Sequence, residues 1–248
     1  MTDETKPAAD APHDDFGPVG YQPLSRIQLI GGARLQAAWS RIPHVTHFDE
    51  ADVTALEAGR KQRNESQSGT RLTLLTWVAR ACVDALREHP RFCASLDEEG
   101  RRVMLKRYVN LGVAVDTPMG LVVAVVHGAD RLSLDELGAA IADLAERGRL
   151  GKLKPTELEG TCFTISSLGS LGGTGFTPII NPPDVAILGV SPARVRPEWI
   201  AGAVEPRLIL PLSLSYDHRV ISGADAARFC TYLRQQLADG HGITPSIP

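Results

Sequence analysis

A histidine stands in the most chemically suggestive stretch of the chain, residues 215–225, which read SYDHRVISGAD. An apolar run typical of a buried strand precedes it at residues 208–214, and a helical pattern follows at residues 226–237. Because imidazole changes its protonation state near neutral pH, His218 at a strand end is suited to move a proton in a reaction. The position alone also suits a hydrogen-bonded structural histidine.

The stretch resembles the DHRxxDG signature of the dihydrolipoyl acyltransferases, the cores of 2-oxo acid dehydrogenase complexes. Chloramphenicol acetyltransferases share a looser HxxxDG form of it. Further blocks resemble the same family in the family's order: IPHVTHFDEAD at 42–52, NLGVAVDTPMGLVV at 110–123, CFTISSLG at 162–169, FTPIIN at 176–181 and AILGV at 186–190. The chain is therefore identified as a member of this family, similar to the pyruvate dehydrogenase type, whose core is an acetyltransferase.

The resemblance implies transfer of an acetyl group between CoA and dihydrolipoamide, which a lipoyl group on another chain or domain supplies. Such transfer needs a base for the attacking thiol and a donor for the oxyanion of the tetrahedral intermediate. The resemblance assigns His218 as the base and Ser166 as the oxyanion donor. Ser167 is the alternative donor, because neighbouring residues of a strand face opposite sides.

Three further residues match family positions at or near the site, and a fourth candidate, Arg60, rests on its charge alone. Asp116 matches a position near the histidine of a neighbouring subunit, although an aspartate that caps the following turn would look the same. Ile179 and Leu188 match positions that line the lipoamide and CoA channel, and plain core residues would look the same. Arg60, in an Arg-Lys-Gln-Arg run, is suited to the CoA phosphates or to a solvated helix face.

One position departs from the family pattern inside the histidine motif. Ser222 stands where the family has aspartate, or asparagine in some acetyltransferases, a residue that orients the site, often through an arginine. Serine is shorter and uncharged, so we expect that contact to be water-mediated or lost. We expect weakened catalysis and no abolition.

The remaining candidate ligands do not predict a metal site. His44 and His47 form an HxxH pattern, but on a strand they point to opposite faces. The four cysteines are scattered without CxxC spacing, and we interpret them as buried free thiols: Cys82, Cys93, Cys162 and Cys230. The sequence therefore predicts no metal and no disulfide.

Composition excludes several classes of protein. The 248 residues are 43% apolar and 22% charged, with a formal net charge of -3, which gives no reason to expect nucleic-acid binding. No apolar run reaches the roughly 18 residues that cross a bilayer. The N-terminus lacks the pattern of a secretory signal. These features predict a cytoplasmic protein with no membrane partner.

The chain divides into a domain between two tails. Residues 1–24 are rich in Pro, Ala, Asp and Gly and are predicted to be disordered, like the linkers of this family. Residues 25–240 form the predicted acyltransferase domain, and residues 241–248 form a C-terminal tail. The sequence contains no lipoyl domain or Asp-Lys-Ala lipoylation motif, and an excised core and a natural core-only protein remain equally open.

Apolar periodicity predicts helices alternating irregularly with strands. The predicted helices cover residues 27–39, 52–64, 72–87, 133–147 and 225–237, and the predicted strands cover 45–49, 103–108, 109–115, 121–126, 161–166, 185–190 and 207–215. This mixture predicts an α+β fold with a mixed sheet. The resemblance implies a chloramphenicol-acetyltransferase-like sandwich with flanking helices.

The resemblance also implies a homotrimer with its active site between subunits, together with a lipoyl domain and other components of a 2-oxo acid dehydrogenase complex as partners. One chain would supply His218 and Ser222, and the next would supply Ser166 and Asp116. Glycines and prolines after residue 239 leave few apolar anchors in the tail, so we expect any larger cage to be weak or absent. A scaffold with weak activity and a xenobiotic acetyltransferase are the alternative functions. The HVTHFDEADV and TISSLG blocks favour the dihydrolipoyl acyltransferase family over a xenobiotic acetyltransferase.

Overall fold

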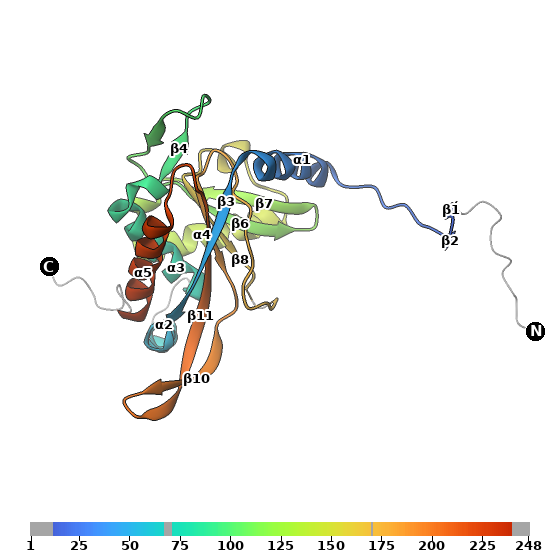
Figure 1. Ribbon diagram of the computed structural model, residues 1–248. Helices are drawn as coiled ribbons and strands as arrows, with labels where there is room; N and C mark the ends of the chain where they lie inside the picture. Colours follow the sequence, from blue (N-terminus) through green and yellow to red (C-terminus); the bar gives the residue numbers. More distant parts are fainter. Residues whose placement is uncertain (1–11, 67–70, 170, 240–248) are drawn as a thin grey trace, which may run out of the picture.

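The computed structural model describes residues 12–66, 71–169 and 171–239, and its centre is a seven-stranded mixed sheet (Figure 1). The strand order is β10-β11-β9-β8-β6-β7, and β3 also pairs with β11. β8 runs parallel to both β6 and β9, whereas the other pairs are antiparallel. The strands are β3 (His44–Asp52), β6 (Leu111–Thr117), β7 (Gly120–Val126), β8 (Phe163–Ser167), β9 (Ala186–Val190), β10 (Arg194–Ile200) and β11 (Ala203–Asp217).

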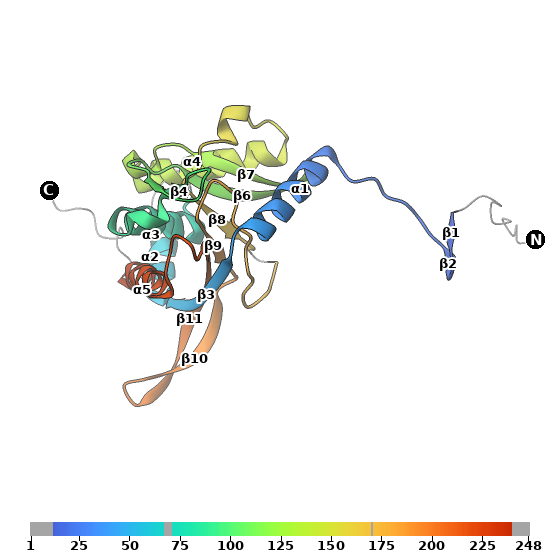
Figure 2. The same ribbon diagram turned by 45° about the horizontal axis from the view of Figure 1, so that its top comes forward.

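β11 organises the sheet because it is long enough to pair with three strands. Its first half pairs with β10, and its second half lies between β3 and β9. The β10–β11 pair extends beyond the other strands as a two-stranded ribbon, which both views show (Figures 1 and 2). Its tight turn places Ala201 and Gly202 at positive φ. The end of β11 opposite this turn leads directly into the histidine motif.

Five helices accompany the sheet: α1 (Arg26–Arg41), α2 (Thr54–Ser66), α3 (Leu74–Glu88), α4 (Leu134–Arg149) and α5 (Gly223–Asp239). α3 packs between α4 and α5, while α5 also contacts β3 and α4 contacts β6 and β7. A capping box of Ser133 and Glu136 starts α4. The hydrophobic core lies between these helices and the sheet, and its largest fully buried side chains include Trp77, Tyr216, Phe92, Phe163 and Phe229.

The prediction of an α+β fold with a mixed sheet is confirmed, although several elements differ from their predicted bounds. β10 and the short β4 (Ala94–Leu96) were not predicted, and β5 (Val103–Leu105) ends before the predicted strand does. β10 escapes prediction although its charged and apolar residues alternate, because Pro197 lies inside the run and argues against a strand, and because the residues are mostly exposed. Three short 3-10 helices connect other elements: η1 (Pro90–Phe92), η2 (Ala129–Arg131) and η3 (Pro155–Glu157).

The N-terminal segment contains more regular structure than predicted. Within the predicted disordered tail, β1 (His13–Asp14) and β2 (Gly17–Pro18) form a small hairpin in which the Asp14 carboxylate accepts hydrogen bonds from the backbone of Phe16 and Gly17. Residues 1–11 and 240–248 lie outside the described residues, so the predictions for them stay predictions. All four cysteines are buried free thiols, as predicted. Among the described residues, no helix has the length and apolar character needed to cross a bilayer.

Candidate active site

His218 follows the last residue of β11 and presents an exposed imidazole at the end of the sheet. Its backbone N–H donates to the Pro43 carbonyl at 3.1 Å, and its ring lies 5.9 Å from the Tyr216 ring, centroid to centroid. The ring has no hydrogen-bond partner among the described residues. A structural histidine would be buried and paired, so this geometry favours a chemical role for His218.

The two residues that flank His218 hold each other through a paired set of charge-assisted bonds. Asp217 is 2% exposed, and its carboxylate accepts from Arg219 Nε at 2.9 Å and from Arg219 Nη2 at 2.6 Å. This bond raises the pKa of the Arg219 guanidinium. The Asp217 backbone N–H also donates to the Val185 carbonyl at 2.8 Å, which ties the turn to the chain that enters β9. The backbone of His218 is therefore fixed on both sides.

Ser222 ends the histidine motif and starts α5. Its hydroxyl donates to the Asp225 carboxylate at 2.7 Å and accepts the Asp225 backbone N–H at 3.2 Å, the reciprocal pattern of a helix cap. The hydrogen bond from Ser222 lowers the pKa of Asp225, which also pairs with Arg228 at 2.8 Å. Ser222 itself contacts no arginine among the described residues, so any orienting contact of the family type is absent within this part of the chain.

Ser166 lies near the end of β8, half-buried, and its hydroxyl has no hydrogen-bond partner among the described residues. The neighbouring Ser167 hydroxyl instead accepts the backbone N–H of Gly169 at 3.3 Å. Ser167 is thus engaged in its own turn, while Ser166 keeps its hydroxyl free for another partner. The geometry favours Ser166 over Ser167 as a donor.

Asp116 lies at the exposed end of β6, opposite Leu121 of β7. The turn that follows is capped by Thr117, whose hydroxyl donates to the Gly120 carbonyl at 2.6 Å and accepts the Met119 backbone N–H at 3.2 Å. The alternative that Asp116 caps this turn is therefore not supported. Its carboxylate has no hydrogen-bond partner among the described residues.

The sheet register divides these residues into two groups. Ser166 and Ser213 both pair with Gly189, so they lie at the same level of the sheet. His218 is five residues beyond Ser213, which places it about 17 Å further along the strand and two strand spacings of about 4.8 Å to the side. Continuing the register of β6 and β8 places Asp116 about 8 Å from Ser166, between Cα atoms, on the same face and at the same end.

The four candidate residues consequently lie at opposite ends of the sheet within one chain. His218 and Ser222 form one candidate half-site, and Ser166 and Asp116 form the other. The two offsets along and across the sheet give a separation of about 19 Å between the Cα atoms of His218 and Ser166. Histidine and serine side chains are too short to bridge it. A complete site with all four residues requires two copies of the chain.

The predicted binding residues differ in their accessibility. Leu188 is fully buried in the core of β9, between Ile165 and Leu214, so it is a core residue of this chain. Its predicted contact with the lipoamide and CoA channel stays a prediction, and a core position gives the same sequence pattern. Ile179 is half-buried, and it precedes Ile180, whose backbone N–H donates to His44 Nε2 at 3.1 Å.

Arg60 is occupied by contacts within the chain. Its Nε and Nη2 both donate to the Glu57 carboxylate at 2.7 Å, and its Nη1 donates to the Leu72 carbonyl at 2.8 Å. The Glu57 pair raises the pKa of Arg60. Lys61 and Arg71 are more exposed and line a surface hollow with it. They are better placed than Arg60 to meet a phosphate, and sequence reasoning did not consider Arg71.

Together, the mixed sheet and the two half-sites define an α+β catalytic domain that carries an exposed histidine at one end and a serine with a carboxylate at the other. The chain belongs to the family of 2-oxoacid dehydrogenases acyltransferase (catalytic domain), whose model matches residues 18–243. The family assignment predicted from the sequence motifs is thereby confirmed.

Curated relatives extend the comparison. The dihydrolipoyllysine-residue acetyltransferase component of the pyruvate dehydrogenase complex of Cupriavidus necator is 53% identical over 226 residues, which are 90% of this chain and 40% of that protein. The protein of the same name from Pseudomonas aeruginosa is 48% identical over 235 residues, which are 94% of this chain and 43% of that protein. The chain thus spans about two fifths of the length of these relatives.

Solved structures show the same fold. The dihydrolipoamide acetyltransferase of Azotobacter vinelandii, solved to investigate the roles of a serine, a histidine and an asparagine in its catalytic mechanism, superposes with a TM-score of 0.89 at 47% identity. The match covers 95% of this chain and 99% of that one. The cubic core of a pyruvate dehydrogenase multienzyme complex also matches, with a TM-score of 0.89 at 48% identity.

Proposed function

We propose that this chain is an acetyltransferase core that moves an acetyl group between dihydrolipoamide and CoA. The observation that carries the proposal is His218, which is exposed at the end of β11, on a turn fixed by Asp217 and Arg219, and whose ring has no hydrogen-bond partner in the part of the chain that the structure describes. The names of the curated relatives support the same activity. In the Azotobacter vinelandii protein, the histidine and asparagine investigated are four positions apart, as His218 and Ser222 are here.

The proposed reaction is a direct transfer between two thiols. The neutral His218 imidazole takes the proton of the CoA thiol, whose pKa near 8.5 makes imidazole a suitable acceptor. The CoA sulfur forms a bond to the carbonyl carbon of the acetyl thioester, and the Ser166 hydroxyl donates to the oxyanion that develops. When the intermediate collapses, the bond to the lipoyl sulfur breaks and that sulfur receives the proton from His218. No acyl group is attached to the enzyme.

Two copies of the chain complete each site in this proposal. The register separates His218 from Ser166 by more than their side chains can span, so one copy supplies the base and its neighbour supplies the oxyanion donor. A closed ring of three chains, as the family resemblance implies, gives three equal sites. The lipoyl domain, the other components of a 2-oxo acid dehydrogenase complex and a cytoplasmic location belong to the same proposal.

The substrates need cationic and apolar contacts that the surface offers. Lys61 and Arg71 provide charge for the CoA phosphates, with Arg60 held behind them by Glu57. Ile179 stays a candidate for contact with the acyl-carrying arms. CoA and the lipoyl group are both substrates here, and the proposed steps use side chains of the protein with no metal.

A transferase assay with dihydrolipoamide and acetyl-CoA tests the proposal on the whole chain. We expect acetyl transfer, and we expect His218→Ala to lower turnover at least about a hundredfold, as loss of a general base does. His127→Ala is the matched control, because His127 is also exposed and its ring bonds only the Thr156 carbonyl among the described residues. Absence of transfer would instead favour a scaffold, and full activity of His218→Ala would overturn the assignment of His218 as the base.

A further inference from the structure

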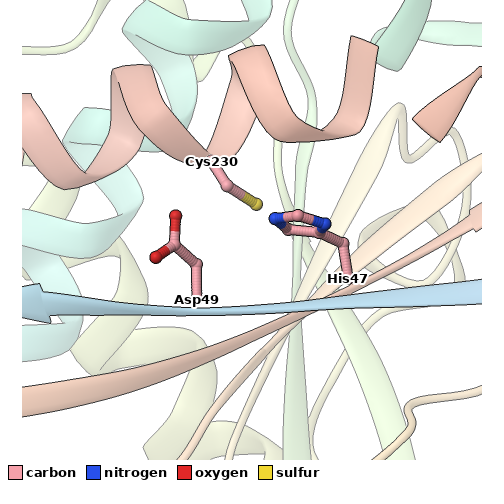
Figure 3. Close-up of side chains that lie close together, drawn as sticks. All are labelled: His47, Asp49 and Cys230. Carbon is pink, nitrogen blue, oxygen red and sulfur yellow. The ribbon is translucent and has the colours of Figure 1, made fainter. Parts of the chain in front are cut away.

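Three side chains with metal-binding atoms converge between β3 and α5, away from the proposed catalytic residues. His47 and Asp49 are two residues apart on β3 and therefore share the face that packs against α5. Cys230 reaches them from the buried side of α5 (Figure 3). One nitrogen, oxygen or sulfur atom from each residue lies within 4.8 Å of the others.

The potential ligand atoms of these three side chains make few hydrogen bonds within the described part of the chain. Among the described residues, the His47 ring and the Cys230 thiol have no hydrogen-bond partner. The Asp49 carboxylate accepts the Glu50 backbone N–H at 2.8 Å and lies 4.0 Å from Arg234 Nη1. Polar side chains that are buried between a strand and a helix usually pair with one another or with a ligand.

From this arrangement we propose that His47, Asp49 and Cys230 form a binding site for a borderline-soft divalent transition-metal ion such as Zn²⁺. Imidazole nitrogen, carboxylate oxygen and thiolate sulfur are all zinc ligands, with bonds of about 2.0–2.3 Å. A point at the centre of three atoms within 4.8 Å of one another is at most about 2.8 Å from each. Small rotamer adjustments would therefore close the site around an ion, with water as the fourth ligand.

The HxxH pattern in the sequence does not form this site. The His44 ring is already engaged, since its Nδ1 bonds the Ile42 carbonyl at 2.8 Å and its Nε2 accepts from Ile180. His47 finds its partners on its own face of β3 and on a helix that is remote in sequence. The expectation of no metal weighed His47 only together with His44, because spacing along a strand does not reveal a ligand on α5.

A surface hollow reaches one of the three proposed ligands, Asp49. Asp49 and Arg234 both line it, together with Phe48, Glu50, Thr174, Pro211 and Leu212. The Arg234 side chain is half-exposed and competes with the metal for Asp49. Because β3 also pairs with β11, a bound ion would cross-link α5 to the strand system that ends at His218.

Cobalt titration of the untagged, metal-free whole chain tests the site. We expect one Co²⁺ per chain with a thiolate-to-metal charge-transfer band that Zn²⁺ displaces, and a rise in thermal midpoint with Zn²⁺ because the ion binds the folded state. Cys230→Ser should abolish the band. His47→Gln and Asp49→Asn should weaken binding at least about tenfold, the lower end of what even outer-sphere changes cost. Arg234→Gln should tighten binding by removing the competing cation.

Cys93→Ser and Cys162→Ser are matched controls. These two buried thiols lie next to each other, and neither belongs to the cluster of His47, Asp49 and Cys230. Both variants should bind Co²⁺ as the parent chain does.

Lack of a charge-transfer band in the parent chain overturns the proposal. A band that persists in Cys230→Ser, or that is lost in Cys93→Ser or Cys162→Ser, overturns it as well. If Cys230→Ser fails to fold, the His47→Gln variant decides, because His47 is only half-buried. Co²⁺ affinity that is unchanged in His47→Gln also overturns the proposed site.

Discussion

Ser166 and Ser167 are adjacent in sequence but differ in what their hydroxyl groups already do. Because Ser167 accepts the Gly169 N–H and Ser166 has no partner among the described residues, Ser166 is free to stabilise an oxyanion. We predict that Ser166→Ala lowers turnover roughly a hundredfold with the fold intact, as loss of one oxyanion donor does. Ser167→Ala should leave turnover within a few-fold. The reverse order in steady-state assays would assign the donor role to Ser167.

Ser222 combines a helix cap with a place in the proposed site. Asparagine is as good an N-cap as serine, so Ser222→Asn should keep the start of α5 intact. We predict that this variant preserves or raises turnover, because it restores a side chain that some acetyltransferases carry. Ser222→Ala should cost about 0.5–2 kcal/mol of unfolding free energy through the lost cap. A stable but inactive Ser222→Asn would mean that the site is built around serine.

At this scale the sequence predicts residues that belong to a contiguous motif, and it fails where a contact depends on the fold. His218 could be assigned from its motif, and its exposure agrees with that role. The capping bond of Ser222 was not foreseen, although a Ser-x-x-Asp spacing before a helix is its ordinary pattern. The core position of Leu188 and the ligand set around Cys230 depend on strand register and helix packing, which local sequence does not encode.

At the scale of elements, a buried carboxyl group links β8 to β9. The Asp184 side chain is 3% exposed, and its Oδ2 accepts from Thr164 at 2.8 Å and from Thr161 at 3.1 Å. Its Oδ1 has no partner among the described residues. Burial raises the pKa of Asp184 to about 6, against the opposing effects of the Thr164 bond and of Lys106.

This raised pKa predicts a pH dependence of stability with a definite sign. In the unfolded chain the carboxyl group has its ordinary pKa of about 4, so between about pH 4 and pH 6 the folded chain binds more protons. The unfolding free energy contributed by Asp184 is therefore full at low pH and falls, by up to about 3 kcal/mol, as pH rises through this window. Asp184→Asn should lack that fall. Urea unfolding of both proteins across the window measures it, and equal pH slopes would contradict the prediction.

The elements also mark where sequence patterns succeed. The amphipathic period of α3 and the capping box of α4 place both helices within two residues of their predicted bounds. The β10–β11 ribbon is different, because β10 is stabilised by pairing with β11 and not by burial of one face. Charged and apolar residues do alternate along β10, but Pro197 within the run is a residue that sequence reasoning takes as evidence against a strand.

At the scale of the whole molecule, a single chain leaves large apolar side chains on its surface. Trp199 on the ribbon is 74% exposed and Trp39 on α1 is 60% exposed, and the same elements carry further exposed apolar residues: Val195 and Val204 on the ribbon, and Leu29, Ile30 and Leu35 on α1. Apolar side chains gathered in this way are typical of surfaces that contact another protein. They agree with the division of the proposed site, which places its two halves at opposite ends of one sheet.

That division predicts complementation between two inactive variants. If each site takes its base from one chain and its oxyanion donor from the next, chains of His218→Ala and Ser166→Ala that assemble together create some sites with both groups intact. Random mixing in equal amounts leaves about a quarter of all sites with both groups intact, and once the mixed assemblies are isolated, a mixed ring of three chains has one intact site in three. The two variants are co-expressed with different tags, mixed assemblies are isolated through both tags, and their activity is compared with that of each variant alone.

A chain with both substitutions, co-assembled with Ser166→Ala, is the control, because no site in that mixture has an intact Ser166. Mixed assemblies without recovered turnover would place His218 and Ser166 in separate functions, since the sheet register keeps them apart within one chain.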